Sequence, residues 1–180
     1  PSRPAGFEPG ATISDAPLPD VVSEVARTLA SGGSTGRPKL IVTREPALVD
    51  PELDTNRARY GGRTLVPGPL YHAGPFMASW QAILSGSCVI LMPRFDAEEF
   101  LALAEKYGAT NAHMVPVMFV RMLNLAAELR AKYDISSIEH IIHGTAPCPP
   151  EVKRAMIDWW GPVFWEYYGS TELGVPVLGT

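Results

Sequence analysis

Short apolar runs alternate with longer segments of helical periodicity from Thr64 onward. Apolar runs of this length are typical of strands, and a regular alternation of strands with helices predicts a mostly parallel sheet with helices packed on it. The expected strands are TLVPG (64–68), CVILM (88–92), TNAHMVPV (110–117), IEHIIHG (138–144) and VFWEYYG (163–169). The fold class expected from the sequence is therefore α/β.

Helices are expected between these strands, over residues 75–86, 96–108, 118–133 and 149–161. Asp96 can cap the second of them, Glu99 completes a capping box, and Gly108 can end it. The last one carries proline in its first turn, where proline is tolerated. The run CVILM is apolar without alternation, which predicts a strand covered on both faces.

The first third of the chain is less regular. Residues 1–20 are expected to be an irregular lead-in because proline recurs there, and residues 43–63 are expected to lie on the surface. Residues 21–30 and 39–42 flank a Gly- and Ser-rich loop and predict a hairpin. The chain begins without methionine, which suggests that it starts inside a longer parent.

Composition favours a globular domain that handles a small molecule. The 180 residues fit one domain or a large part of one, and 46% of them are hydrophobic. A net charge of −4 without a basic run argues against a nucleic-acid partner. No apolar stretch approaches the roughly 20 residues of a membrane span. Whether the protein forms a homo-oligomer is left open.

The two cysteines, Cys88 and Cys148, belong to no CxxC motif or Cys/His cluster. This spacing argues against a zinc site, and both side chains are expected to be buried thiols. Such cysteine usage suits a reducing compartment, and we expect a cytoplasmic protein.

The loop SGGSTGRPK, from Ser31 to Lys39, has the composition of a phosphate-binding segment. It matches neither GxxxxGK[ST] nor GxGxxG. Its glycines allow close approach of the backbone to a ligand and expose N–H groups, and Lys39 adds a charge suited to phosphate oxygens. Taken alone, the residues are compatible with either a surface turn or a phosphate loop.

Three segments follow expected strands at their carboxyl ends: GPLYHAGP, HGTAPCPP and YYGSTELG. Ligands of parallel α/β sheets bind beyond these ends, so we expect the three segments to build one site. In the last of them an aromatic ring can stack on a purine, hydroxyls can bind phosphate, and the Glu172 carboxylate can hold Mg²⁺. Alternatively, this stretch is a strand followed by a glycine turn, with Glu172 merely solvated.

Together these motifs closely resemble the adenylate-forming superfamily. SGGSTGRPK, PLYHAGPF, GTAPCP and YGSTE occur in the order expected for acyl-CoA synthetases, firefly luciferases and the adenylation domains of nonribosomal peptide synthetases. The loop reads GGSTG where the family commonly has the sequence Ser-Gly-Thr-Thr-Gly, which keeps small and hydroxyl residues. The resemblance implies a fragment of the family's large N-terminal domain.

The resemblance assigns the nucleotide site. The loop that closes over the β- and γ-phosphates of ATP would comprise Ser31, Gly32, Gly33, Ser34, Thr35, Gly36 and Lys39. Tyr168 would stack on adenine, and the other side of the base would be lined by Gly144, Thr145, Ala146 and Pro147. Within the last motif, Gly169 and Ser170 would also bind nucleotide, Thr171 would contact the α-phosphate, and Glu172 would ligate Mg²⁺. Tyr167 is the competing aromatic.

The resemblance also places His72 near the substrate carboxylate or the acyl pocket. His113 has two interpretations, a residue of the acyl pocket or a residue of the core. Lys39, Thr171, Glu172 and His72 are therefore the residues expected to take part in the chemistry.

The implied reaction has two halves. A carboxylate attacks the α-phosphorus of ATP and pyrophosphate leaves; the thiol of coenzyme A then attacks the acyl-adenylate. The motifs look like those of bacterial acyl-CoA synthetases of the fatty-acid or bile-acid type. Two alternatives remain: a family member with another acceptor, such as a carrier-protein-loading adenylation domain or a luciferase-like oxygenase, and a non-catalytic nucleotide-binding module.

The family's ribose-binding aspartate, hinge and C-terminal domain with its catalytic lysine would follow Thr180. The 180 residues alone are therefore expected to be incompetent as a ligase.

Overall fold

The computed structural model describes residues 21–30, 36–43, 48, 61–172 and 174–179. The expectations for residues 1–20, and most of those for residues 43–63, lie outside this part of the chain. The described residues form a two-stranded and a six-stranded sheet. The small sheet pairs β1 (Arg27–Ala30) with β2 (Leu40–Thr43) in antiparallel register, which confirms the predicted hairpin.

The large sheet has the strand order β4-β3-β5-β6-β7-β8. The bounds are β3 (Arg63–Val66), β4 (Cys88–Leu91), β5 (Asn111–Met114), β6 (His140–His143), β7 (Phe164–Ser170) and β8 (Gly174–Gly179). The first five strands in this order pair in parallel and β8 runs antiparallel to β7. The predicted mostly parallel α/β sheet is thus confirmed.

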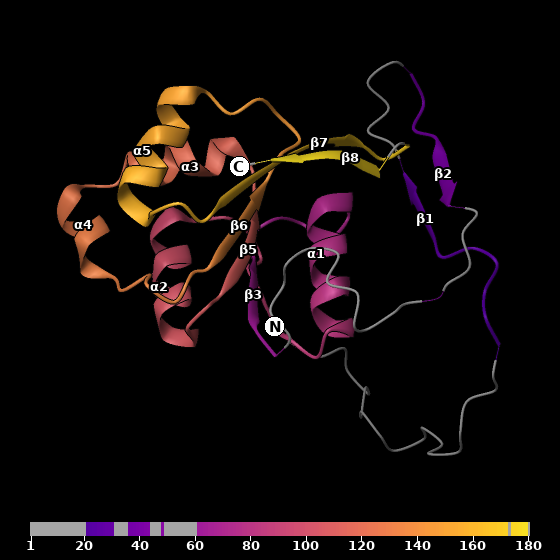
Figure 1. Ribbon diagram of the computed structural model, residues 1–180, viewed down its shortest axis with the longest axis horizontal. Helices are drawn as coiled ribbons and strands as arrows, with labels where there is room; N and C mark the ends of the chain where they lie inside the picture. Colours follow the sequence, from indigo (N-terminus) through magenta and orange to yellow (C-terminus); the bar gives the residue numbers. More distant parts are fainter. Residues whose placement is uncertain (1–20, 31–35, 44–47, 49–60, 173, 180) are drawn as a thin grey trace.

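Helices cover both faces of the large sheet (Figure 1). On one face lies α1 (Ala73–Leu84); on the other lie α2 (Ala97–Tyr107), α3 (Pro116–Leu123) and α5 (Pro150–Trp160), with the short α4 (Ala127–Lys132) beyond them. The single helix predicted over 118–133 is wrong. The chain leaves the helix at Asn124, where the bond from Leu125 N–H to the Met122 carbonyl spans only three residues, and begins a new helix at Ala127.

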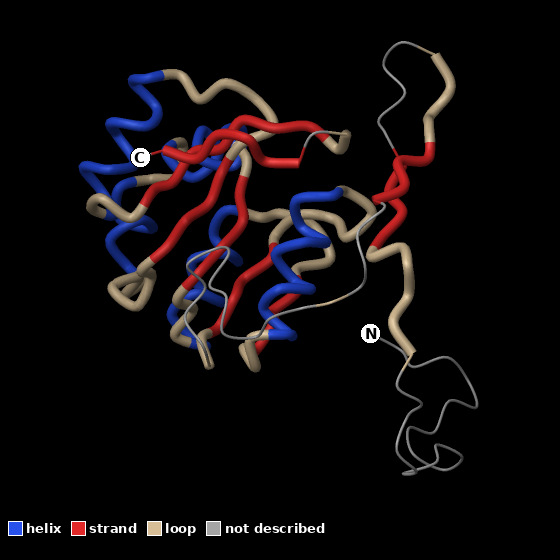
Figure 2. Tube along the Cα trace, turned by 45° about the vertical axis from the view of Figure 1, so that its right-hand side comes forward, coloured by secondary structure: helices blue, strands red, loops and turns tan. Residues whose placement is uncertain are grey.

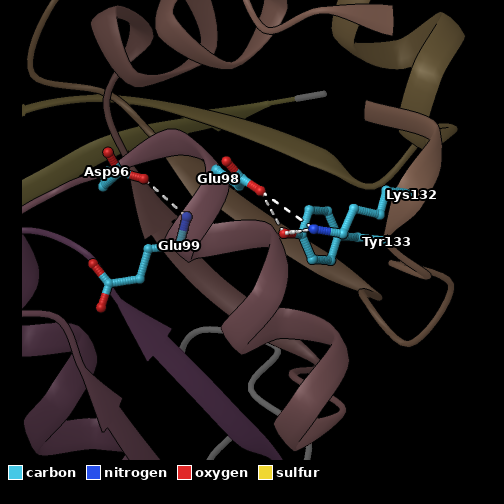
Figure 3. Close-up of polar contacts among 5 residues, drawn as sticks. All are labelled: Asp96, Glu98, Glu99, Lys132 and Tyr133. Carbon is cyan, nitrogen blue, oxygen red and sulfur yellow. Dashed lines mark hydrogen bonds and ion pairs between the residues drawn. The ribbon is translucent and has the colours of Figure 1, made fainter. Parts of the chain in front are cut away.

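The predicted ends of α2 are confirmed. The Asp96 carboxylate accepts a hydrogen bond of 2.9 Å from the Glu99 backbone N–H, and Gly108 adopts a left-handed conformation with φ of 57°. Figure 3 shows the Glu99 carboxylate pointing away from Asp96, so only the Asp96 half of the predicted capping box is visible.

The main core lies between the sheet and the α2/α3/α5 layer. Fully buried side chains there include Leu65, Met114 and Ile141 of the strands and Phe100, Phe119 and Met156 of the helices. Aromatic rings pack closely in this layer: the Phe119 and Phe164 centroids are 5.4 Å apart in an edge contact. This core fixes α3 and α5 against the middle strands, and thereby fixes the loops that leave those strands.

The prediction that the CVILM strand is covered on both faces is wrong. β4 lies at one end of the strand order, and Cys88 and Leu91 at its two ends are exposed while its two middle residues are half-buried. Cys88 is consequently exposed rather than buried, and Cys148, in the loop before α5, is only half-buried. Among the described helices none is both long and apolar enough to cross a membrane.

Candidate active site

The carboxyl ends of the five parallel strands share one edge of the large sheet, and the loops after β3, β6 and β7 carry most of the predicted site residues. His72 ends the loop that follows β3, and Gly144–Pro147 follow β6. Tyr168–Ser170 end β7, and Thr171 and Glu172 lie in the turn after it. The sheet therefore brings together the three segments that the sequence predicted to converge.

Gly144 and Tyr167 are in direct contact. The β6–β7 register places His143 opposite Glu166, and Gly144 and Tyr167 come next along each strand. A Cβ built on Gly144 would lie 2.6 Å from the Tyr167 ring, closer than real Cβ contacts. Gly144 therefore allows the loop after β6 to approach the end of β7, which sets that loop beside Tyr168.

The Tyr168 ring is 74% exposed, whereas Tyr167 is half-buried. Successive side chains of a strand point to opposite faces, so the two tyrosines serve different purposes. Tyr167 packs inward against Gly144, and Tyr168 presents an uncovered ring next to the loop. Of the two aromatics that the sequence offered for stacking on adenine, the structure leaves Tyr168 accessible.

The loop after β6 has an unusual backbone at Thr145, whose φ is 66°. A β-branched residue with positive φ is rare and strained, and such conformations persist only where the surroundings impose them. Thr145, Ala146 and Pro147 are all exposed. The loop therefore has an exposed surface, and its strained backbone must be held in place by neighbouring residues.

His113 and Tyr167 form a polar pair at the same edge of the sheet. The His113 Nε2 and Tyr167 Oη atoms are hydrogen-bonded at 3.2 Å. Burial, opposed in part by a backbone hydrogen bond, lowers the pKa of His113 to about 4, and burial also raises the pKa of Tyr167. Both side chains are therefore uncharged at neutral pH.

The amino-terminal turn of α1 rests against this pair. A Cβ on Gly74 would lie 2.5 Å from the His113 ring and 3.3 Å from the Tyr167 hydroxyl, so only glycine fits there. This close crossing also carries His72, the residue before α1, to the carboxyl edge of the sheet. His72 is exposed, and its ring centroid lies 4.6 Å from that of Tyr71.

The end of β7 contains an irregularity. The pairing with β8 shifts register between Tyr168 and Ser170, and Thr171 and Glu172 form the turn that follows. Bulges of this kind are common beside active sites because they redirect side chains. Glu172 is exposed at this turn. A single accessible carboxylate suits Mg²⁺ that takes its other oxygens from phosphates and water.

Among the described residues, no group of three or more acidic, histidine or cysteine side chains could hold a metal ion.

The predicted phosphate loop belongs to the separate hairpin. Gly36 and Lys39 are exposed just before β2, and Ser31–Thr35 lie outside the described residues. Arg27 of β1 donates a hydrogen bond of 3.6 Å to the Met77 sulfur, which joins the hairpin to α1. In Figures 1 and 2 the ends of β7 and β8 that meet at their turn point toward the hairpin.

Sequence reasoning missed the groups that support the site from below. Lys153 of α5 and Glu166 of β7 form an ion pair of 3.1 Å, and His143 is fully buried against the Phe119 and Phe164 rings. Burial lowers the pKa of His143 to about 4, with Glu166 raising it and Lys153 lowering it. The partners in these contacts are distant in sequence, so no local pattern pointed to them.

The sequence pattern of a family described as "AMP-binding enzyme" matches residues 14–180. The chain is 32% identical to 4-coumarate–CoA ligase 5 of Oryza sativa subsp. japonica, over 98% of this chain and 34% of the relative. It is 32% identical to luciferin 4-monooxygenase of Nipponoluciola cruciata, over 89% of this chain and 30% of the relative. The chain thus spans about a third of the length of these relatives.

The fold is similar to that of the inhibitor-bound N-terminal domain of FACL13 from Mycobacterium tuberculosis. The TM-score is 0.73 at 24% identity, with 88% of this chain and 40% of that chain covered. At this identity the similarity concerns the fold alone.

Proposed function

Because the chain belongs to the AMP-binding enzyme family, we propose that it supplies the nucleotide-binding part of an acid–thiol ligase. The parent enzyme would activate a carboxylic acid with ATP to an acyl-adenylate, release pyrophosphate, and form a thioester with coenzyme A. The observation that carries the proposal is the exposed Tyr168 ring beside the Gly144–Pro147 loop at the carboxyl edge of a parallel sheet.

Adenine would lie between Tyr168 and the exposed face of the Gly144–Pro147 loop. Aromatic stacking on one side and backbone on the other would hold the base without requiring a charged group. Gly169, Ser170 and Thr171 would follow the nucleotide from the base toward the α-phosphate. The bulge at the end of β7 supports this assignment because it turns the chain there.

Lys39 and the glycines and hydroxyls of residues 31–36 would hold the β- and γ-phosphates from the hairpin. Glu172 would bind Mg²⁺, which neutralises phosphate charge when bound. Positioning and electrostatic stabilisation provide most of the catalysis in phosphoryl chemistry, and a lysine, hydroxyls and backbone N–H groups are this chain's contribution to that half-reaction.

The acid would approach from the start of α1, where Gly74, two residues after His72, packs against the His113–Tyr167 pair. His72 would lie near the carboxylate. We propose an apolar acid of the fatty-acid or bile-acid kind, since Phe76, Met77 and Trp80 on α1 are apolar and only half-buried. The name of the rice relative supports an aromatic acid as the competing class.

Another acceptor is the second candidate function. The relative named luciferin 4-monooxygenase makes an oxygenase after adenylation a specific alternative to thioester formation. A carrier-protein-loading domain and a non-catalytic nucleotide-binding module complete the possibilities.

Carboxylate-dependent exchange of pyrophosphate into ATP by the full-length protein tests the proposal. A panel of fatty, bile and aromatic acids should give exchange with at least one apolar acid, and coenzyme A should then be acylated. Exchange without acylation of coenzyme A would favour another acceptor. A complete absence of exchange together with nucleotide binding would favour the non-catalytic module.

A further inference from the structure

We propose that the Lys153–Glu166 ion pair is a positioning device that holds the Gly144–Pro149 loop against the end of β7 and so sets the affinity for the adenine base. The inference rests on the proposed function, since it takes Tyr168 and this loop as the two sides of the adenine site.

The pair connects both ends of the loop to the strand that carries Tyr168. Glu166 lies opposite His143, the residue directly before the loop, and two positions before Tyr168. Lys153 lies in the first turn of α5, where its backbone N–H donates to the Pro149 carbonyl at 3.0 Å. Their side chains meet at 3.1 Å, which closes a ring of contacts under the loop.

The alternation along β7 agrees with this arrangement. Phe164 packs against Phe119 of α3 and Trp160 of α5, so Glu166 and Tyr168, at two and four positions further, share that face of the sheet. Tyr167 points to the opposite face, where it contacts Gly74 of α1. The ion pair therefore joins α5 to the same side of β7 that presents Tyr168.

The charges of the ion pair influence titratable groups at both ends of the loop. Burial has the largest effect on the pKa of His143, the residue directly before the loop, and lowers it. The Glu166 charge raises this pKa and the Lys153 charge lowers it. Burial raises the pKa of the Cys148 thiol, near the end of the loop. The Glu166 charge also raises this pKa, and the Lys153 charge lowers it.

The pair is shielded enough to act as an anchor. The shielding comes from the lysine: Lys153 is 17% exposed, and its partner Glu166 is 36% exposed. The Lys132–Glu98 pair is longer, at 3.5 Å, and its side chains are 58% and 41% exposed. Exposed pairs contribute little, while removal of one partner from a shielded pair leaves an unpaired charge. Figure 3 shows the exposed pair, which lies between α2 and α4 and is a matched control.

The loop also needs an anchor. Thr145 has a positive φ, and a strained conformation of this kind persists only when its surroundings impose it. Gly144 restrains the start of the loop through Tyr167, and the ion pair restrains its end through α5. Loss of the ion pair should let the loop relax away from Tyr168.

The experiment uses the full-length protein with the variants Lys153→Met, Glu166→Gln and Lys153→Arg, and Lys132→Met as the control. The dissociation constant for AMP, the KM values for ATP and for the acid, kcat and the thermal midpoint are measured for each. In Lys153→Met and Glu166→Gln, weaker binding of the base should raise the AMP dissociation constant and the ATP KM together, by about tenfold, equivalent to 1.4 kcal/mol. The kcat and the KM for the acid should change by less than about twofold.

Lys153→Arg keeps the charge and should bind AMP within about threefold of wild type, and Lys132→Met should be unchanged. Wild-type-like AMP binding in both folded charge-removal variants would overturn the inference. Equal losses for AMP and the acid with a lowered thermal midpoint would also overturn it, because they would show a merely structural role.

If Lys153→Met fails to fold, Glu166→Gln decides. Absence of AMP binding by wild type would instead overturn the proposed function, and this inference with it.

Discussion

The two halves of the proposed nucleotide site are built in different ways. The base half, formed by the Gly144–Pro149 loop and the end of β7, stands on the main sheet and is joined to it by tight glycine contacts, buried rings and a shielded ion pair. The phosphate half, around Gly36 and Lys39, belongs to a two-stranded hairpin, and both of these residues are exposed. Binding of the base is thus tied to the stability of the core, whereas phosphate chemistry is largely separate from it.

Replacement of Lys39 should have the largest effect on activity and the least effect on the fold. Loss of a charge that stabilises the transferring phosphates should lower the rate of acid-dependent pyrophosphate exchange by about 10²-fold in Lys39→Ala. AMP, which lacks the β- and γ-phosphates, should bind as before, and the thermal midpoint should stay constant. Calorimetric AMP binding and exchange assays on the full-length protein check this. If Lys39→Ala lost AMP binding and acid binding to the same extent, the proposed difference between the two halves would be wrong.

Replacement of Gly144, unlike that of Lys39, should affect both the stability of the fold and the binding of AMP. A methyl group would meet the Tyr167 ring at 2.6 Å, and overpacking of this kind costs about 1–3 kcal/mol. Gly144→Ala should therefore lower the free energy of unfolding in urea and weaken AMP binding together. Gly179→Ala, at a glycine with open space around its Cβ, is the control, and Tyr167→Ala in the Gly144→Ala background should recover part of the stability. A fully stable Gly144→Ala would refute the tight contact.

The buried histidines of the base half should make the fold sensitive to acid. The pKa of His113 falls from 6.5 to about 4 on folding, so the unfolded chain binds more protons between these values and stability is lost as pH drops through this window. Urea unfolding at pH 5 should give a free energy about 2 kcal/mol lower per such histidine than at pH 7. His113→Gln should reduce this difference. An equal difference in His113→Gln and wild type would contradict this assignment.

Glu172 should give the smallest effect, because it is one ligand among several. In Glu172→Gln the Mg²⁺ concentration for half-maximal pyrophosphate exchange should rise by about threefold to tenfold, without a change in thermal midpoint. Glu151→Gln, an exposed carboxylate in the first turn of α5, serves as the control. An unchanged Mg²⁺ titration would remove Glu172 as a ligand.

The sequence predicted the parallel α/β architecture, the hairpin and the ends of α2 because these depend on local periodicity, glycines and caps. Membership of the adenylate-forming family, inferred from four motifs, is confirmed by the family match over residues 14–180. The assigned roles of the individual site residues remain predictions.

The features that escaped prediction depend on distant neighbours. The exposure of Cys88 follows from the position of β4 at the sheet edge, which the apolar run does not encode. No strand was predicted over β8, which includes Pro176; an edge strand can accommodate proline. The Lys153–Glu166 and His113–Tyr167 pairs join residues 13 and 54 positions apart and arise only when the sheet assembles.

Equilibrium binding of AMP to the full-length protein and to its Tyr168→Ala variant tests the central claim most directly. The exposed ring makes little contribution to the core, so the variant should fold with an unchanged thermal midpoint and bind AMP at least about tenfold more weakly, consistent with a loss of about 1–3 kcal/mol of base stacking. Tyr168→Phe should bind like wild type. Equal AMP affinity in wild type and Tyr168→Ala would contradict the placement of the adenine site at this edge of the sheet.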